Sequence, residues 1–373
     1  MRIVKSGTKY DVYHDNSLLV YEELPATFFN VKFHQQKGFW LEERNPFTID
    51  EKMYGSHAKK AEKVMRTFNI FERNLGVILS GNKGIGKSLT AKRICLNAIE
   101  EKIPVIIVDS YIPGIGSFLS EIEQKVVVLF DEFDKTFAET RDGENSPQTE
   151  MLSLFDGLDS GKKLFIVTCN RHENLNEFIV NRPGRFHYHF RFEYPSSEEV
   201  LEYLQDNLKE EYYNQIPSVS KFANTINLNY DCLRAIAFEI NTGAKFEECV
   251  KDLNILNLGY QKYDFKLMFT DGTSVSTAAN MRPYESDKYT IEFQDKRGRY
   301  ILDINFNTAD IRYESGKDAY LLPEQFEVIW YWGDYHDCDD ESEPEESKIL
   351  KTKTIDRLVI TRAKEKGLHY NLA

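Results

Sequence analysis

One stretch decides the fold of this chain: Val77-Ile78-Leu79-Ser80-Gly81-Asn82-Lys83-Gly84-Ile85-Gly86-Lys87-Ser88-Leu89-Thr90. Branched apolar residues lead into the pattern G-x-x-x-x-G-K-S, and a helix-forming stretch, residues 89–101, follows. Glycines let the backbone wrap a polyanion without Cβ clashes, and the N–H groups of the turn and of the next helix then face it. This context is typical of a phosphate-binding P-loop. The alternative, a chance glycine turn before a helix, is disfavoured by the strand and helix on either side.

The residue types of this loop predict ATP and Mg²⁺ as cofactors. Lys87 supplies a cation to the β- and γ-phosphate oxygens, and the Ser88 hydroxyl is placed to ligate Mg²⁺. The residues expected to contact the nucleotide are Gly81, Asn82, Lys83, Gly84, Ile85, Gly86, Lys87, Ser88 and Leu89.

A second acidic element follows the apolar run Val126-Val127-Val128-Leu129-Phe130, which ends in Asp131-Glu132-Phe133-Asp134. A parallel strand releases its side chains at its carboxyl end, where a P-loop also lies. We therefore expect Asp131 to hold the Mg²⁺ ion through its water shell and Glu132 to polarise the attacking water as general base. The alternative is a solvent-exposed acidic turn.

Continuous apolar strands alternate with helical segments around these motifs. Residues 103–109, 126–130 and 164–168 are expected to be buried strands. This alternation predicts an α/β fold, a P-loop αβα sandwich with a parallel sheet covered on both faces. Asn170 follows the last of these strands, where its amide can hydrogen-bond the γ-phosphate or the lytic water.

Composition bounds the remaining possibilities. A chain of 373 residues is expected to form two or three domains, and 41% hydrophobic residues indicate a globular protein. The formal net charge of −13 argues against broad nucleic-acid binding by the whole surface. Scattered cysteines indicate core thiols in a reducing compartment. No signal peptide and no membrane-length apolar run is visible, so we expect no membrane association and a cytoplasmic location.

The segments before the P-loop predict a small β unit and an adenine contact. Residues 1–46 read as short strands, with a hairpin at 27–42 that we expect to cap the next domain. The core domain is expected to span residues 47–194. Tyr54 and Gly55 offer a ring and a bare backbone that would suit a flat base, and plain packing of Tyr54 is the alternative.

The order of these parts resembles an AAA+ ATPase of the classical AAA branch. The matching motifs are residues 81–88 (Walker A), 126–134 (Walker B), Asp156-Gly157-Leu158 (the inter-subunit signalling turn), Asn170 (sensor 1) and Arg182-Pro183-Gly184-Arg185-Phe186. The arrangement is most similar to the mitochondrial Rieske-protein translocase and its relatives. It departs from them in the loop G-N-K-G-I-G-K, where G-P-P-G-T-G-K is usual, and in having no transmembrane segment before the module.

The resemblance implies a homo-oligomeric ring, commonly of six subunits and of seven in the translocase, with ATP between neighbours. Arg182 and Arg185 would then be arginine fingers that reach the neighbour's γ-phosphate, Arg185 being the favoured one. The alternative is that both arginines form local ion pairs. The resemblance also places Tyr111 and Ile112 at a central-pore loop, with simple packing as the alternative.

Beyond the core, helical periodicity over residues 195–257 fits the small lid of AAA+ proteins. The resemblance implies a sensor 2 role for Arg234, in which it contacts nucleotide, and the alternative is a surface ion pair. Residues 258–373 alternate in a way that predicts an antiparallel β domain, interrupted by an acidic segment at 334–346.

These observations predict a Mg²⁺-dependent ATPase that works as a ring and remodels, unfolds or translocates a protein client. One alternative is a nucleic-acid loader or translocase, which would need basic pore residues that residues 111–119 lack. Another is a nucleotide-gated scaffold that hardly turns ATP over, against which Glu132 argues.

Overall fold

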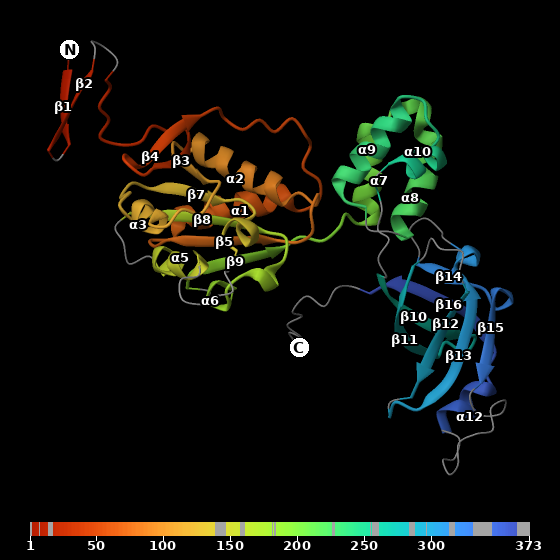
Figure 1. Cartoon of the computed structure of the whole chain (residues 1–373). Helices are drawn as coiled ribbons and strands as arrows, with labels where there is room; N and C mark the ends of the chain where they lie inside the picture. Colours follow the sequence, from red (N-terminus) through yellow and green to blue (C-terminus); the bar gives the residue numbers. More distant parts are fainter. Residues whose placement is uncertain are drawn as a thin grey trace. The chain divides into compact units, whose positions relative to one another are not determined.

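The computed structural model describes residues 2–6, 8–13, 18–138, 147–156, 161–180, 182, 184–225, 228–253, 255, 261–282, 288–295, 297–312, 318–330 and 345–363. The chain divides into two compact units, Met1–Tyr194 and Pro195–Ala373. Figure 1 labels the helices and strands of both units. None of the helices formed by the described residues combines the length and the apolar character that crossing a membrane requires.

The first unit is built on one seven-stranded sheet with the order β4-β3-β6-β7-β8-β5-β9. Its strands are β3 (Phe28–His34), β4 (Gly38–Arg44), β5 (Leu75–Ser80), β6 (Val105–Val108), β7 (Val126–Phe130), β8 (Lys163–Cys169) and β9 (Phe186–Arg191). Every neighbouring pair is parallel except the β3–β4 hairpin. The predicted parallel α/β sheet is confirmed.

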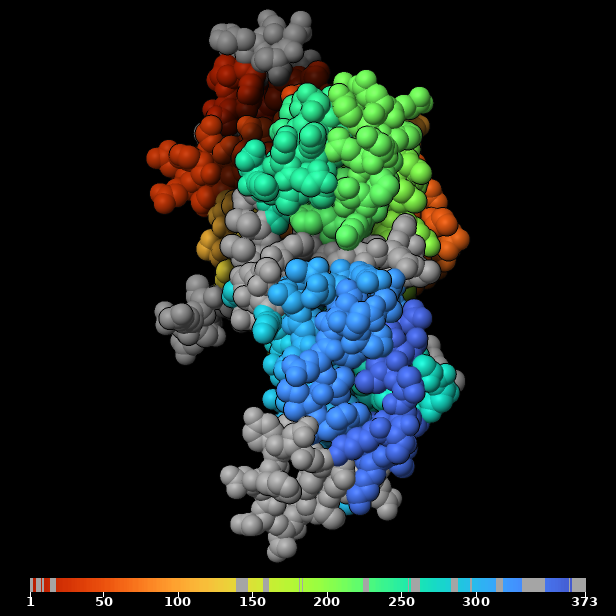
Figure 2. All heavy atoms as spheres, turned by 90° about the vertical axis from the view of Figure 1, so that its right-hand side faces the viewer, coloured from red at the N-terminus to blue at the C-terminus, as the bar shows by residue number. Residues whose placement is uncertain are grey.

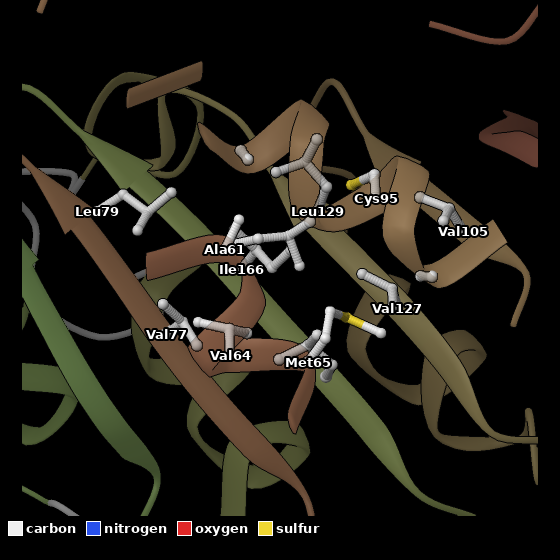
Figure 3. Close-up of a cluster of buried hydrophobic side chains, with 14 of the residues drawn as sticks. Ala61, Val64, Met65, Val77, Leu79, Cys95, Val105, Val127, Leu129 and Ile166 are labelled. Carbon is white, nitrogen blue, oxygen red and sulfur yellow. The ribbon is translucent and has the colours of Figure 1, made fainter. Parts of the chain in front are cut away.

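Helices cover both faces of this sheet. They are α1 (His57–Ile70), α2 (Lys87–Glu100), α3 (Ile115–Ser120), α4 (Phe133–Thr136), α5 (Pro147–Asp156) and α6 (Glu177–Val180), with a 3-10 turn at η1 (His172–Asn174). Successive strand residues point to opposite faces, so a strand that is apolar throughout feeds two cores. Leu79 and Leu129 pack with α1 and α2 in one core, whereas Ile78 and Phe130 pack with α3 and α5 in the other. Figure 3 shows the first of these layers, in which strand side chains meet Val64 and Met65 of α1.

The N-terminal hairpin differs from the expected separate cap. Strand β3 pairs in parallel with β6, with Phe28 opposite Val105, so the hairpin is an edge of the central sheet. Phe28 belongs to the core under α1 and α2, and Val31 packs against the other core. The apolar residues of β3 therefore gain more burial as a sheet strand than they would in a free-standing hairpin. A second hairpin, β1 (Arg2–Ser6) with β2 (Lys9–Tyr13), precedes it.

The second unit begins with helices and continues with strands, and its surface faces the viewer in Figure 2. The helices are α7 (Ser197–Asn207), η2 (Glu210–Gln215), α8 (Ile216–Thr225), α9 (Tyr230–Asn241) and α10 (Phe246–Asp252). A capping box at Ser196 and Glu199 starts α7, and the side chain of Asn229 accepts the Cys232 N–H at the start of α9.

The strands of the second unit form two antiparallel sheets, β11-β10-β16-β14 and β12-β13-β15. Their elements are β10 (Gln261–Phe269), β11 (Ser274–Met281), β12 (Lys288–Gln294), β13 (Tyr300–Asn307), η3 (Thr308–Asp310), β14 (Ala319–Leu321), η4 (Pro323–Gln325), β15 (Phe326–Trp330), α12 (Glu345–Lys351) and β16 (Ile355–Arg362). Residues of both sheets share one apolar core around Phe265 and Phe293. The predicted β-rich C-terminal region is confirmed. Of the predicted acidic segment at 334–346, residues 334–344 lie outside the described residues.

Candidate nucleotide-binding site

The P-loop connects the end of β5 to the start of α2. Gly81, Gly84 and Gly86 have φ values of +138°, +71° and +91°, a region that side chains disfavour. A Cβ on Gly81 would lie 2.4 Å from the backbone oxygen of Phe192, and a Cβ on Gly86 would lie 2.8 Å from Cε1 of His57. Space and backbone angle therefore both require glycine at the two ends of the loop. Of the other loop residues, Asn82, Lys83 and Ser88 are exposed, Leu89 is half-buried and Ile85 is buried.

Lys87, the first residue of α2, folds back under this loop. Its Nζ donates to the backbone oxygens of Gly81 and Asn82, both at 2.6 Å, and to Oδ1 of Asn170 at 3.0 Å. Burial lowers the pKa of Lys87, and nearby acidic groups, among them Asp131, oppose that shift. These contacts hold the ammonium group at the loop, where a phosphate group would be bound.

Ser88 and Asp131 come together as the sequence predicted for a Mg²⁺ site. The Ser88 hydroxyl lies 3.3 Å from Oδ1 of Asp131, and the Thr168 hydroxyl donates to the same oxygen at 2.5 Å. Mg²⁺ is usually held by one or two protein oxygens together with phosphates and water, and this pair fits such a role. The described residues contain no group of three or more His, Cys, Asp and Glu side chains that would hold a metal without a nucleotide.

Thr168 is a residue of this site that the sequence analysis missed. Its hydroxyl donates to Asp131 and also accepts the backbone N–H of Glu132 at 2.8 Å. It therefore orients both acidic residues at the end of β7. The signal was present, because Thr168 is the hydroxyl residue at the end of the otherwise apolar run Leu164-Phe165-Ile166-Val167.

Glu132 occupies a left-handed backbone conformation with φ of +49°, which is uncommon for a residue with a side chain. Its carboxylate is half-exposed and forms an ion pair with Lys135. The hydrogen bond from Lys135 is the largest cause that lowers the pKa of Glu132, and the nearby side-chain amide of Asn170 and the charge of Lys83 contribute. Glu132 is thus an anion at neutral pH, as a general base must be, and in this structure it is engaged with Lys135.

Asn170 lies directly beside the P-loop because β8 is the sheet neighbour of β5. Its Oδ1 accepts the hydrogen bond from Lys87, whereas its Nδ2 is buried and has no hydrogen-bond partner among the described residues. A buried donor without a partner is costly. Nδ2 of Asn170 is therefore a buried donor whose hydrogen bond is not formed within the described residues.

The two arginines after α6 differ from what the sequence favoured. Arg185 is 8% exposed, and its guanidinium forms a two-pronged ion pair with Asp156 of the same chain while Nη1 donates to the Phe178 carbonyl at 3.1 Å. The same pair lowers the pKa of Asp156, with the hydrogen bond from Arg185 as the largest cause. A buried guanidinium needs such a partner. For Arg185 the structure therefore agrees with the alternative of a local ion pair, not with an arginine finger. Arg185 is not presented to a neighbouring chain in this structure.

Arg182, by contrast, is exposed and its guanidinium carbon lies 5.6 Å from the ring centroid of Phe178. Asn181 and Pro183 of this segment lie outside the described residues, as do Gly157 and Leu158 of the predicted signalling turn. Arg182 is therefore the better placed of the two arginines to reach another molecule.

The sequence predicts that Tyr54 and Gly55 contact the adenine base and that Tyr111 lies at a pore loop. Tyr54 is 6% exposed, which favours its packing alternative, and Gly55 has a φ of +61°. The Tyr111 hydroxyl donates to Glu150, and its ring packs edge-on against Phe137 with centroids 5.5 Å apart. Burial followed by that hydrogen bond raises the pKa of Tyr111 to about 12. These contacts favour packing over a pore role.

Arg234 lies in the second unit, on α9. It is exposed and forms an ion pair with Asp231, with Nη1 3.4 Å from Oδ1. This contact is the surface ion pair that is the alternative to a sensor 2 role for Arg234. A contact between Arg234 and nucleotide stays a prediction.

A parallel sheet with a P-loop, an acidic strand end and a polar strand end beside it is the nucleotide site of a P-loop ATPase. Residues 77–194 match the family described as "ATPase family associated with various cellular activities (AAA)". Residues 77–194 are thus similar to AAA ATPase domains.

Curated relatives support the same class. The chain is 22% identical over 268 residues to a proteasome-associated ATPase of Mycolicibacterium gilvum, which covers 61% of this chain and 43% of the relative. It is 28% identical over 165 residues to an "AAA ATPase forming ring-shaped complexes" of Corynebacterium kroppenstedtii, covering 36% and 28%. It is 25% identical over 151 residues to protein mac-1 of Caenorhabditis elegans, covering 37% and 18%. The chain thus spans less than half the length of these relatives. They do not bear on the finer resemblance to the Rieske-protein translocase.

Proposed function

We propose that this chain is a Mg²⁺-dependent ATPase that works as a homo-oligomeric ring and remodels a protein client. The observation that carries the proposal is the contact between Lys87 and Asn170, which leaves the buried Nδ2 of Asn170 without a partner among the described residues. A cation and an amide donor side by side at the carboxyl edge of a parallel sheet suit a transferred phosphoryl group.

Each residue of the site has a distinct role in this proposal. Lys87 holds the β- and γ-phosphate oxygens, and Asn170 donates to the γ-phosphate or the attacking water. Ser88 and Asp131 hold Mg²⁺, which when bound neutralises charge on the phosphates. Glu132 accepts a proton from the attacking water after its carboxylate leaves Lys135.

Arg182 completes the site of a neighbouring copy in this proposal. Its exposure supports this role, since a guanidinium that reaches a γ-phosphate from outside stabilises the charge of the transition state. Arg185 instead braces the segment through Asp156. A relative named for ring-shaped complexes supports assembly into a ring, whose size of six or seven subunits follows only from the resemblance stated above.

A protein client is favoured by two observations. Several relatives are named proteasome-associated ATPases. Residues 111–119 also contain no Lys or Arg with which to follow a nucleic-acid backbone. Recovery of Glu132→Gln with ATP from the native host, followed by identification of what it holds, tests this part. A bound nucleic acid in place of a protein would contradict it.

The ATPase itself is tested by separating binding from turnover. Glu132→Gln and Asn170→Ala are expected to bind ATP within about threefold of wild type and to lose turnover by a factor on the order of 10² to 10³. Asn174→Ala, an exposed asparagine further along the same connection, is the matched control and is expected to leave both unchanged. Full turnover by Glu132→Gln, or equal loss in the Asn174 control, would contradict the assignment.

A further inference from the structure

Asp134 is the last residue of the Asp131-Glu132-Phe133-Asp134 run, and none of the roles above uses it. It lies in the first turn of α4 and is 7% exposed. Its Oδ2 accepts two backbone N–H groups from the turn after β8, that of Asn170 at 3.1 Å and that of Arg171 at 3.2 Å. One carboxylate oxygen thereby ties the main chain of Asn170 to the helix that follows Glu132.

The second oxygen of Asp134 is unusual. Its Oδ1 is buried and has no hydrogen-bond partner among the described residues. A buried carboxylate that is only half satisfied costs free energy. Asp134 is also one of the acidic groups whose charge acts on Lys87. The Asp134 carboxylate thus interacts with both partners of the Lys87–Asn170 contact. It accepts the backbone N–H of Asn170, and its charge acts on the ammonium group of Lys87.

The position of the Asn170 side chain depends on this tie. Asn170 follows the last residue of β8, so the sheet no longer fixes its backbone, and its Oδ1 accepts the hydrogen bond from Lys87. The two hydrogen bonds to Asp134 supply the constraint that the sheet does not.

We propose that Asp134 is a positioning residue that sets Asn170 against Lys87 for ATP hydrolysis, a role that rests on the proposed function. Asp134 itself touches no reacting atom. It acts by fixing the backbone from which the Asn170 amide extends, and a displacement of about 1 Å in such a group can cost on the order of 10²-fold in rate.

Gln148 provides a matched control because its side chain also forms hydrogen bonds to the main chain that follows β8, at residues 174 and 176. It is completely buried, its Nε2 donates to the Asn174 carbonyl at 2.9 Å, and its Oε1 accepts the Asn176 N–H at 2.6 Å. Both side chains hold the main chain after β8, but only Asp134 holds it at Asn170. A general structural role would make the two equivalent.

The test combines backbone hydrogen exchange with kinetics on the full chain, for wild type, Asp134→Ala, Asp134→Asn and Gln148→Leu. In Asp134→Ala we expect the amides of residues 170–171 to exchange at least tenfold faster and kcat to fall on the order of 10²-fold, while the Kd for ATP stays within about threefold. Asp134→Asn keeps a carbonyl acceptor, so we expect exchange near that of wild type and kcat within about tenfold of it. Gln148→Leu is expected to loosen residues 174–176 and to leave kcat within about threefold.

Several results would overturn the proposal. They are unchanged exchange at residues 170–171 in Asp134→Ala, unchanged kcat, a parallel loss of kcat and ATP affinity, or an equal loss of kcat in Gln148→Leu. If Asp134→Ala does not fold, Asp134→Asn decides, since a hundredfold loss of kcat with residues 170–171 still protected would contradict it. A wild-type chain that binds ATP without turning it over would contradict the proposed function, and the exchange result would still show whether Asp134 holds this turn.

Discussion

Lys87 and Asn170 are 83 positions apart in the chain and joined by a hydrogen bond of 3.0 Å between Nζ and Oδ1. The contact exists because β5, which leads to Lys87, and β8, which leads to Asn170, are parallel neighbours in register, with Ser80 opposite Cys169. The polar groups proposed to act on the γ-phosphate are therefore assembled by the sheet itself.

Thr168 is predicted to be required for turnover. Thr168→Val keeps the shape of the side chain but removes the hydroxyl that donates to Asp131 and accepts from the Glu132 N–H. We expect kcat to fall about 10- to 100-fold, because both acidic residues lose their orientation. Steady-state ATPase assays measure this, with Thr168→Ser as the control that restores the hydroxyl. Wild-type turnover in Thr168→Val would show that this hydroxyl is dispensable.

The two arginines are predicted to separate stability from catalysis. Arg185→Ala is expected to lower the free energy of unfolding by about 2 to 4 kcal/mol, less than for a fully buried pair because Asp156 is 35% exposed. Arg182→Ala is expected to change it by less than about 0.5 kcal/mol, yet to lower kcat about 10³-fold. Urea unfolding and ATPase assays measure the two effects. Equal free energies of unfolding for the two variants would contradict a stabilising role of the Arg185–Asp156 ion pair.

Lys135 is predicted to set the acid limb of the pH–rate profile. Its hydrogen bond is the largest cause that lowers the pKa of Glu132, so Lys135→Ala should raise that pKa toward its ordinary value. A general base must be deprotonated, and we therefore expect the acid limb of kcat/KM, which reports the free enzyme, to move to higher pH, whereas Lys135→Arg keeps it in place. A limb that stays fixed in Lys135→Ala, or moves to lower pH, speaks against Glu132 as the base.

A buried histidine, His57, and a half-buried one, His189, predict that the first unit loses stability in acid. Burial lowers the pKa of both His57 and His189 from 6.5 to about 4. Between these values the unfolded chain binds more protons than the folded one, so stability falls as pH falls from about 6.5 to 4. At pH 5 His57 is expected to cost about 2 kcal/mol relative to neutral pH, and the more exposed His189 is expected to cost less because solvent screens its charge.

The measurement is urea unfolding at pH 7 and pH 5 for wild type and for the double variant His57→Gln, His189→Gln. The double variant should lose less stability between the two pH values than wild type does. An equal loss in both proteins would mean that other groups account for the acid sensitivity.

The sequence alone predicted the parts of the site that local pattern determines. The P-loop and the Asp131-Glu132 pair follow buried strands, and because parallel strands end at one edge of a sheet, their meeting could be inferred without coordinates. The contacts of Ser88 with Asp131 and of Lys87 with Asn170 agree with that inference.

Other features depend on partners that the local sequence does not specify. The pairing of β3 with β6 is a choice among sheet edges, and a hairpin with alternating residues is compatible with several of them. The ion pair of Arg185 with Asp156 joins residues that are 29 positions apart. The family motifs place these two residues in separate elements, so the motifs do not predict their contact. A motif match indicates which residue types are present. It does not indicate how deeply a side chain is buried, and burial decides whether an arginine can reach another subunit or pairs within its own chain.

The most direct test of hydrolysis between two copies of the chain mixes two inactive variants, Glu132→Gln and Arg182→Ala. The first has a disabled base but an intact Arg182, and the second has the reverse, so mixed assemblies contain some complete sites. We expect each variant alone to bind ATP without turnover, and the mixture to recover a measurable fraction of wild-type ATPase activity. No recovery in mixtures shown to co-assemble with ATP, or full activity of Arg182→Ala alone, would contradict a site shared between copies.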